Sequence, residues 1–174
     1  MDAAGRLPPI AGHFHIAQVN VGLPVAPVDT PVLAEFMALL DPINAIADEA
    51  PGFVWRLQTG EGNATSIPVL GDERLIINMS VWESIDHLTD FVYRSGHVAV
   101  MRRRREWFER IKVFFALWWV PTGRLPTVTE AEARLEHLRA HGPTAHAFTF
   151  RQRFPAPGAL EAPQLDDDLL GCPA

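Results

Sequence analysis

Residues 75–97, "LIINMSVWESIDHLTDFVYRSGH", combine two hydrophobic patterns in one short stretch. The first part, residues 75–82, is rich in β-branched and large apolar side chains, which is typical of a β-strand. Ser84 stands where a helix N-cap is expected. After it, apolar side chains recur at helical spacing, at Ile85, Leu88, Phe91 and Val92. Ser95 and Gly96 break this pattern, so the stretch predicts a strand followed directly by a helix.

The chain before this stretch predicts two more strands and one helix. Residues 13–21 and 53–58 are rich in β-branched and aromatic residues and are expected to be strands. Thr30 followed by Pro31 is the signature of a helix start. Asp41–Pro42 predicts an interruption, after which the helix resumes.

The chain after this stretch predicts further elements of both kinds. A second helical segment is expected from His97 to about Arg110, and a strand at residues 113–120. A capping box of Thr129 and Glu132 would begin a third helix, and residues 145–154 predict a fifth strand. The order β-α-β-β-α-β, with an added C-terminal helix and strand, predicts an α+β, ferredoxin-like antiparallel sheet with helices on one face.

Composition limits the classes of function. The chain has 174 residues, 48% of them hydrophobic and 21% charged, which fits one compact domain at residues 13–155, between an N-terminal extension (1–12) and a flexible acidic tail (156–174). No apolar run is long enough for a membrane span, and no export signal is recognised, so we expect a cytoplasmic location. A net charge of −6 disfavours nucleic acid and membrane partners, and the single Cys172 excludes an internal disulfide and a multi-cysteine zinc site.

Three predicted strands each place polar side chains beside apolar ones on one face. A half-solvated antiparallel sheet is one interpretation. Strand 113–120, however, is apolar on both faces, which favours a sheet covered on both sides. We therefore expect a homodimer in which a second subunit closes over the polar face and leaves a small-molecule pocket. The candidate ligand-binding residues of this pocket are Gln18, Asn20, Arg56, Asn78, Ser80, Trp82 and Trp118.

Several runs of sequence resemble a known bacterial family. They are "PGFVWRLQ", "NMSVWESIDHLTDFVYRSGH", "RRREWF", "LWWVPTG", "RLPT", "EARLEHLRAHGPT" and "AFTFRQRFP", within residues 14–155. The family is the domain of unknown function 3291, in the dimeric α/β-barrel superfamily that includes antibiotic-biosynthesis monooxygenases. The resemblance implies homodimers whose sheets form a barrel with a small-molecule pocket, but it does not fix the function.

Helical geometry singles out two residues of the segment "HVAVMRRRREWF". At 100° per residue, His97, Met101, Arg104 and Phe108 fall on one stripe, whereas Arg102, Arg103, Glu106 and Glu109 form a solvated face. Arg104 on an apolar stripe needs a partner, either a core carboxylate such as Glu83 or Asp90, or an acidic or enolate-like ligand. His97 is equally open to two interpretations, a structural histidine or a catalytic base.

Histidine pairs provide a weaker signal for metal binding. His13 and His15 share a strand face, and His137 and His141 are one helical turn apart, but neither pair has an identifiable third ligand. We therefore expect neither a metal nor a cofactor.

Two hypotheses for the function follow. One is a cofactor-independent monooxygenase or isomerase with His97 as base, and Arg104 and Arg56 stabilising negative charge. The other is a non-catalytic ligand-binding or sensing dimer. Haem binding or degradation is a third, narrower hypothesis, because some members of the superfamily use an asparagine, a tryptophan and a histidine for it. Asn20 and His97 could supply two of these, but Phe91 stands near the place of the tryptophan.

Overall fold

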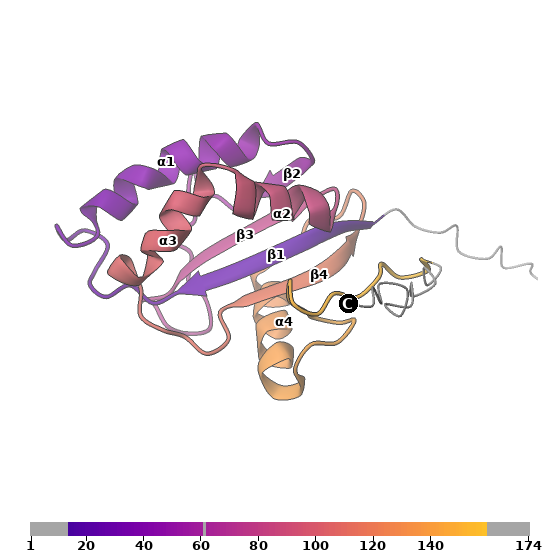
Figure 1. Cartoon of the computed structure of the whole chain (residues 1–174). Helices are drawn as coiled ribbons and strands as arrows, with labels where there is room; N and C mark the ends of the chain where they lie inside the picture. The colour runs from indigo at the N-terminus through magenta and orange to yellow at the C-terminus, as the bar shows by residue number, and fades with distance from the viewer. Residues whose placement is uncertain (1–13, 61, 160–174) are drawn as a thin grey trace, which may run out of the picture.

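The computed structural model describes residues 14–60 and 62–159, which form one antiparallel sheet and four helices (Figure 1). The strands are β1 (Phe14–Gly22), β2 (Phe53–Arg56), β3 (Ile76–Trp82) and β4 (Phe115–Pro121). The helices are α1 (Ala34–Asp48), α2 (Ile85–Arg94), α3 (His97–Trp107) and α4 (Val128–His141). The sheet order is β2-β3-β1-β4, so the first and third strands lie in the centre. This topology confirms the predicted α+β, ferredoxin-like class.

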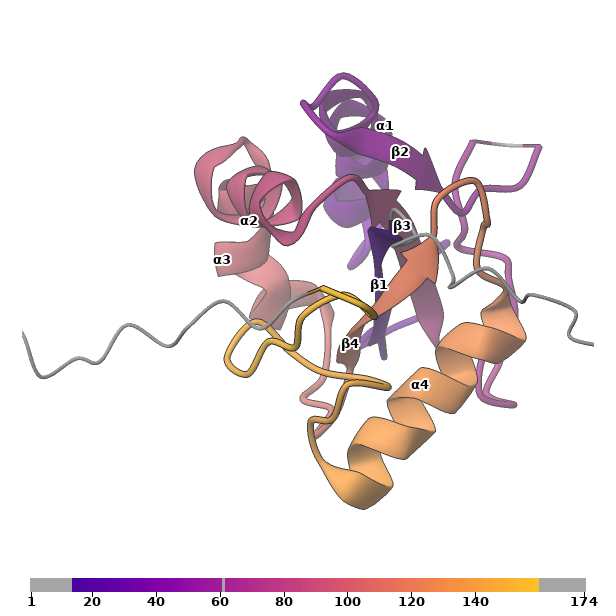
Figure 2. The same ribbon diagram turned by 90° about the vertical axis from the view of Figure 1, so that its right-hand side faces the viewer.

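The helices lie on both sides of the sheet. Helices α1, α2 and α3 cover one face, and α4 crosses the other (Figures 1 and 2). Ile16, Trp82 and Leu117 of the first face pack with Ala47 of α1 and Leu88 of α2. Gln18 and Ser80 belong to this same face. The prediction that a second subunit covers the polar face is therefore wrong, because the chain covers it with its own first three helices.

The opposite face is apolar apart from His15 near the start of β1. Its strand residues pack against Ala131, Leu135 and Leu138 of α4, all of them buried. The segment between β2 and β3 adds Ala64 and Val69 to this cluster. Both faces of β4 are thus covered, as its two apolar faces predicted, and the whole cover comes from the chain itself.

The fifth predicted strand, residues 145–154, is not a strand. Within the described residues its backbone pairs with the sheet only where Phe148 exchanges two hydrogen bonds with Leu117, at 2.8 and 2.9 Å. Phe148 and its neighbours instead fold back beside β4 and contribute aromatic side chains to the first face. Packing of these rings, rather than a ladder of backbone hydrogen bonds, holds the segment.

Several helix boundaries differ from the sequence prediction. Helix α1 begins at Ala34 and not at Thr30–Pro31, and α3 ends at Trp107 and not near Arg110. Helix α1 runs through Pro42 without ending there. Proline removes one backbone hydrogen bond, but the residues beyond it, such as Ala47, gain burial against the sheet by continuing the helix. Helix α4 is capped by Thr127, which accepts a hydrogen bond from the amide of Glu130, and not by Thr129. The predicted Ser84 cap of α2 is confirmed, since its side chain accepts from the amide of His87.

Within residues 14–60 and 62–159, no helix is both long and apolar enough to cross a bilayer.

Candidate functional site

Two adjoining cavities lie between the sheet and helices α1 to α3. The larger has a volume of about 670 Å³ and the smaller about 140 Å³. Both are lined by Asn20, Ile43, Asn44, Arg56, Asn78, His97, Met101 and Arg104. They are therefore two lobes of one site. Its size falls within the range of roughly 300–1,000 Å³ that is usual for small-molecule pockets.

Helix α3 turns one face toward this site. The residues of the stripe, His97, Val100, Met101, Arg104, Trp107 and Phe108, all line the smaller lobe. Arg102, Arg103 and Glu106 line neither lobe. The helical spacing predicted this division of side chains.

Arg104 reaches the site without a carboxylate partner. Its guanidinium lies 3.9 Å from the ring centre of Phe114, and it donates one hydrogen bond of 3.3 Å to the carbonyl of Val21. Burial lowers the pKa of Arg104 below its usual value, although the group stays charged. Glu83 and Asp90, the predicted ion-pair partners, instead contact His87 and Arg94. Among the described residues, one of the five N–H donors of Arg104 has a hydrogen-bond acceptor.

His97 begins α3 and lies on the same stripe. Its ring is 5.0 Å from that of Phe91, which stacks on Trp82. Burial lowers the pKa of His97, and the backbone of Val92 offsets part of this effect. The imidazole is therefore neutral at neutral pH, and its Nδ1 is buried without a hydrogen-bond partner among the described residues.

The floor of the larger lobe is a hydrogen-bonded network on β1 and β3. Gln18 donates to Asn78 at 2.7 Å and to the hydroxyl of Ser80 at 2.9 Å. Trp82 also donates to Ser80, at 2.9 Å, so the hydroxyl accepts twice and keeps its own hydrogen for a further acceptor. Asn20 donates to Asn78 at 3.3 Å. The network fixes these side chains and leaves the amide nitrogen of Asn78 free to donate.

Arg56 lines both lobes but has its own partners. Its guanidinium binds the carboxylate of Asp48 with two hydrogen bonds, of 2.7 and 3.1 Å. It also donates to the carbonyl of Gly62 at 2.7 Å. This arginine joins the end of α1 to β2, so it has less capacity for an anionic ligand than Arg104.

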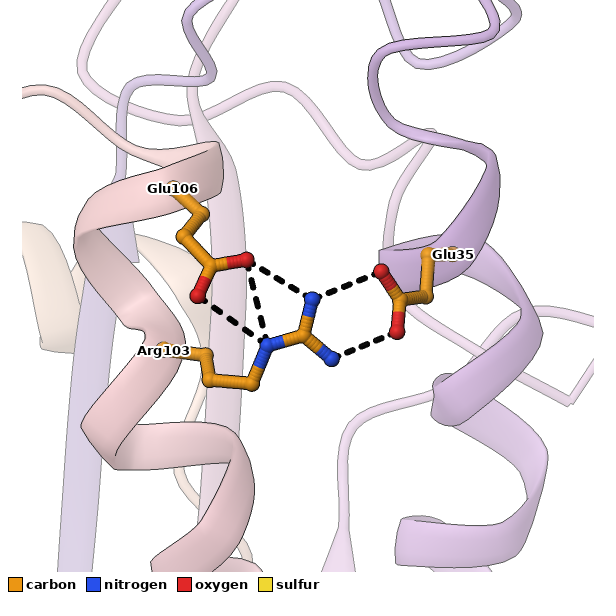
Figure 3. A network of polar contacts seen from close by, with 3 residues as sticks. All are labelled: Glu35, Arg103 and Glu106. Atoms are coloured by element: carbon orange, nitrogen blue, oxygen red, sulfur yellow. Dashed lines mark hydrogen bonds and ion pairs between the residues drawn. The ribbon is translucent and has the colours of Figure 1, made fainter.

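A network of charges joins α3 to α1 on the solvent side of the site. Arg103 lies between Glu106, one turn further along α3, and Glu35 of α1, with Nη2–O distances of 2.7 and 2.6 Å (Figure 3). These contacts lower the pKa of Glu35 and Glu106. Trp107 is the one buried residue of α3, so the helix has few buried contacts and the charge network stabilises its position against α1.

Trp118 is not part of the site. It lies on the opposite face, where its indole donates to Glu130 of α4 at 3.1 Å. The prediction that Trp118 contacts a ligand in this pocket is therefore wrong. The other predicted site residues all line at least one lobe.

The sequence prediction missed several lining residues. Lys112 and Arg151 lie at the larger lobe, and Phe91 forms part of its aromatic wall. Lys112 and Arg151 follow no helical or strand periodicity that could have indicated them. Among the described residues that line either lobe, none is acidic, although the chain as a whole carries a net charge of −6. The site is thus electropositive in an acidic protein.

Neither lobe of the site is lined by His15, His137 or His141, and His13 lies outside the described residues. The ring of His137 is tilted against that of His141, with 4.7 Å between their centres, and the ring centre of His146 is 4.6 Å from that of His137. Within residues 14–60 and 62–159, no group of three or more His, Cys, Asp or Glu side chains is arranged to hold a metal ion.

Comparison with models of protein families shows to which family the chain belongs. The model of the family described as "Domain of unknown function (DUF3291)" matches residues 15–164. The chain belongs to the DUF3291 family. No curated protein matches this DUF3291 chain.

Several solved structures resemble this DUF3291 protein at low sequence identity. SnoaB, a cofactor-independent oxygenase from Streptomyces nogalater, is 17% identical, with a TM-score of 0.42 over 65% of this chain and 98% of SnoaB. A protein of unknown function from Nitrosomonas europaea is 13% identical, with a TM-score of 0.40 over 67% of this chain and 98% of its own. Another N. europaea protein, provisionally named an antibiotic biosynthesis monooxygenase, is 13% identical, with a TM-score of 0.40 over 66% of this chain and 92% of its own.

Proposed function

We propose that this DUF3291 protein binds an acidic or enolisable small molecule between its sheet and helices α1 to α3. The observation that carries the proposal is the guanidinium of Arg104, which faces the site without a carboxylate partner among the described residues. Leaving a half-buried cation without an anion is costly. An anionic ligand would offset that cost and gain charge-assisted hydrogen bonds.

His97 gives this site a means to convert its ligand. A neutral imidazole can accept a proton from an activated carbon or hydroxyl group. Arg104 is seven residues further along α3, about 10 Å along the helix axis. A planar ligand lying along α3 could contact both groups. Arg104 would stabilise the negative charge left after proton removal, as expected of a cofactor-independent monooxygenase or isomerase.

The polar side chains of the sheet would orient such a ligand. Asn78 offers an amide donor and Ser80 a hydroxyl hydrogen, and both are held by Gln18. Groups that are fixed before the ligand arrives lose little conformational freedom on binding.

A non-catalytic ligand-binding or sensing role is the second candidate. Nδ1 of His97 has no carboxylate partner within the described residues, and the group that raises the pKa of the ring is the backbone of Val92. Catalytic histidines are commonly oriented by such a partner. This observation favours binding without turnover.

Binding of aromatic carboxylates and 1,3-diketones to Arg104→Met and His97→Gln variants tests the proposal. Arg102→Met is a matched control, because Arg102 is on the same helix and lines neither lobe. We expect Arg104→Met to raise the dissociation constant by about 10- to 100-fold. Equal losses in Arg104→Met and Arg102→Met would contradict the proposal.

Turnover separates the two candidates. Loss of product formation in His97→Gln, with binding retained, supports an enzyme. Saturable binding with no product after long incubation supports a binding or sensing protein.

We also propose that the chain forms a homodimer, as the resemblance to the dimeric α/β-barrel superfamily implies. Sedimentation equilibrium measures this directly, and a single monomeric mass at all protein concentrations would contradict it.

A further inference from the structure

Apolar side chains form much of the wall of each lobe, and the two lobes use different ones. The smaller lobe has a mainly apolar wall, which includes Phe36, Leu39, Leu40, Val100, Trp107 and Phe108. The larger lobe has an aromatic wall, which includes Phe53, Trp82, Phe91, Phe114, Phe115 and Phe150. The polar groups Asn20, Asn78, His97 and Arg104 line both lobes. The polar centre of the site therefore lies between two apolar arms.

We propose that the ligand carries its acidic group in the interior of the molecule, with an apolar arm on each side. This inference rests on the proposed binding of an acidic ligand and names its chemical class. The class is a 1,3-dicarbonyl compound, bound as its enolate with the released proton taken up by water. One arm lies in each lobe.

The enolate of a 1,3-dicarbonyl matches the polar centre chemically. Its charge is shared by two oxygen atoms in one plane, and the planar guanidinium of Arg104 presents parallel N–H donors to such a pair. The amide nitrogen of Asn78 offers a further donor on the sheet side. An acid with its carboxylate at one end could place an apolar arm in only one lobe.

The volume of the smaller lobe limits one arm. It measures about 140 Å³. An apolar cavity of about 150 Å³ is known to hold one benzene molecule. The smaller lobe therefore admits a single six-membered ring, and the larger lobe, at about 670 Å³, admits a bicyclic arm.

The test measures dissociation constants by titration, following the ultraviolet absorption of the enolate for the diketones and the displacement of bound dibenzoylmethane for phenylacetate. The probes are dibenzoylmethane, with a ring on each side, benzoylacetone, with a ring and a methyl group, and dinaphthoylmethane, with two double rings. Phenylacetate serves as an acid with a terminal carboxylate. We expect dibenzoylmethane to bind about 10- to 100-fold more tightly than phenylacetate, because its second ring is also buried. Dinaphthoylmethane should bind at least tenfold more weakly than dibenzoylmethane, since one double ring has no room.

Val100→Phe places a ring in the smaller lobe, and Val98→Phe is the control on the same helix, outside both lobes. Val100→Phe should raise the dissociation constant of dibenzoylmethane by tenfold or more and change that of benzoylacetone by no more than about threefold. If this variant does not fold, the order of the dissociation constants measured for the wild-type protein alone tests whether the acidic group lies in the interior of the ligand.

Two different failures are distinguishable. If phenylacetate binds as tightly as dibenzoylmethane and loses affinity in Arg104→Met, the proposed function stands and the interior position of the acidic group is wrong. If no probe binds in a manner that depends on Arg104, both proposals are wrong.

Discussion

At the scale of single residues, Arg104 is positioned at a cost to the fold. Its charge is half-buried, and its contacts within the described residues are one carbonyl and aromatic rings. A residue kept under such conditions is expected at a binding site rather than in a structural core. The sequence indicated this residue because an arginine interrupted an apolar stripe, but it could not show which partner Arg104 has.

Replacement of Arg104 by methionine should therefore affect stability and binding in opposite directions. We expect the free energy of unfolding of Arg104→Met to be unchanged or up to about 1 kcal/mol higher, because the loss of the desolvation cost outweighs the loss of the cation–π contact. Urea denaturation measures this change. A decrease of about 2 kcal/mol or more would show that Arg104 has a structural role instead.

His97 should make stability depend on pH. Its pKa in the folded chain is lower than the value near 6.5 expected for the unfolded chain. Between these two values the unfolded chain binds more protons, so the free energy of unfolding rises with pH. Acidification from about pH 7 to about pH 5 should destabilise the protein, and His97→Gln should remove part of this dependence.

His146 provides the comparison for this experiment. Burial and the nearby Arg134 and His137 lower its pKa as well, far from the site. His146→Gln should remove a separate part of the dependence on pH. An identical pH dependence in the wild type and in His97→Gln would contradict the assignment of a buried, neutral His97.

At the scale of elements, α3 positions the two candidate functional residues and is itself weakly held. It buries one residue, Trp107, and its N-cap Gly96 provides no side-chain cap, although the hydroxyl of Ser95 accepts a hydrogen bond of 3.1 Å from the amide of His97. The ion pairs of Arg103 to Glu35 and Glu106 connect it to α1 (Figure 3). Helical spacing placed Arg103 and Glu106 on one solvated face, but Glu35 is too distant in sequence to be inferred from periodicity.

Removal of the Glu35 carboxylate should loosen α3 selectively. In Glu35→Gln we expect amide hydrogen exchange to become faster in α3, with little change in β1. The effect should shrink at high salt, because the side chains of this pair are exposed. Glu136→Gln, on exposed α4 surface, is the control. Equal exchange rates in α3 of both variants would show that the network does not hold this helix.

Strand and helix patterns predicted most elements, and the errors have physical causes. Strand β2 contains an irregularity between Phe53 and Trp55, so strict alternation does not describe its faces. Residues 145–154 have the composition of a strand, but only Phe148 pairs with β4. Tertiary packing of their aromatic side chains, which local sequence does not encode, decides their conformation.

At the scale of the whole molecule, the main error concerned what covers the polar face. Alternation showed that Gln18 and Asn20 share one face, and Asn78 and Ser80 do so too, and the structure brings these faces together. Alternation could not show that α1 to α3 lie over this face and α4 over the other. For the same reason Trp118 was assigned to the wrong side of the sheet. Periodicity identifies which residues point together, but it does not identify the element against which they pack.

A site enclosed by one chain should bind its ligand independently of assembly. Because residues of a single chain line both lobes, we expect one ligand per chain and a dissociation constant that does not change with protein concentration. Calorimetric titrations at several protein concentrations measure both quantities. Half a ligand per chain, or affinity that increases with concentration, would show that a second subunit completes the site.

We propose that the guanidinium of Arg104 receives the acidic group of the ligand, and nitrogen-15 NMR of the arginine side chains during titration with dibenzoylmethane measures this contact. We expect a saturable shift of the Arg104 Nε–H resonance, with those of Arg102 and Arg103 unchanged. Saturable binding that leaves the Arg104 resonance in place would contradict it.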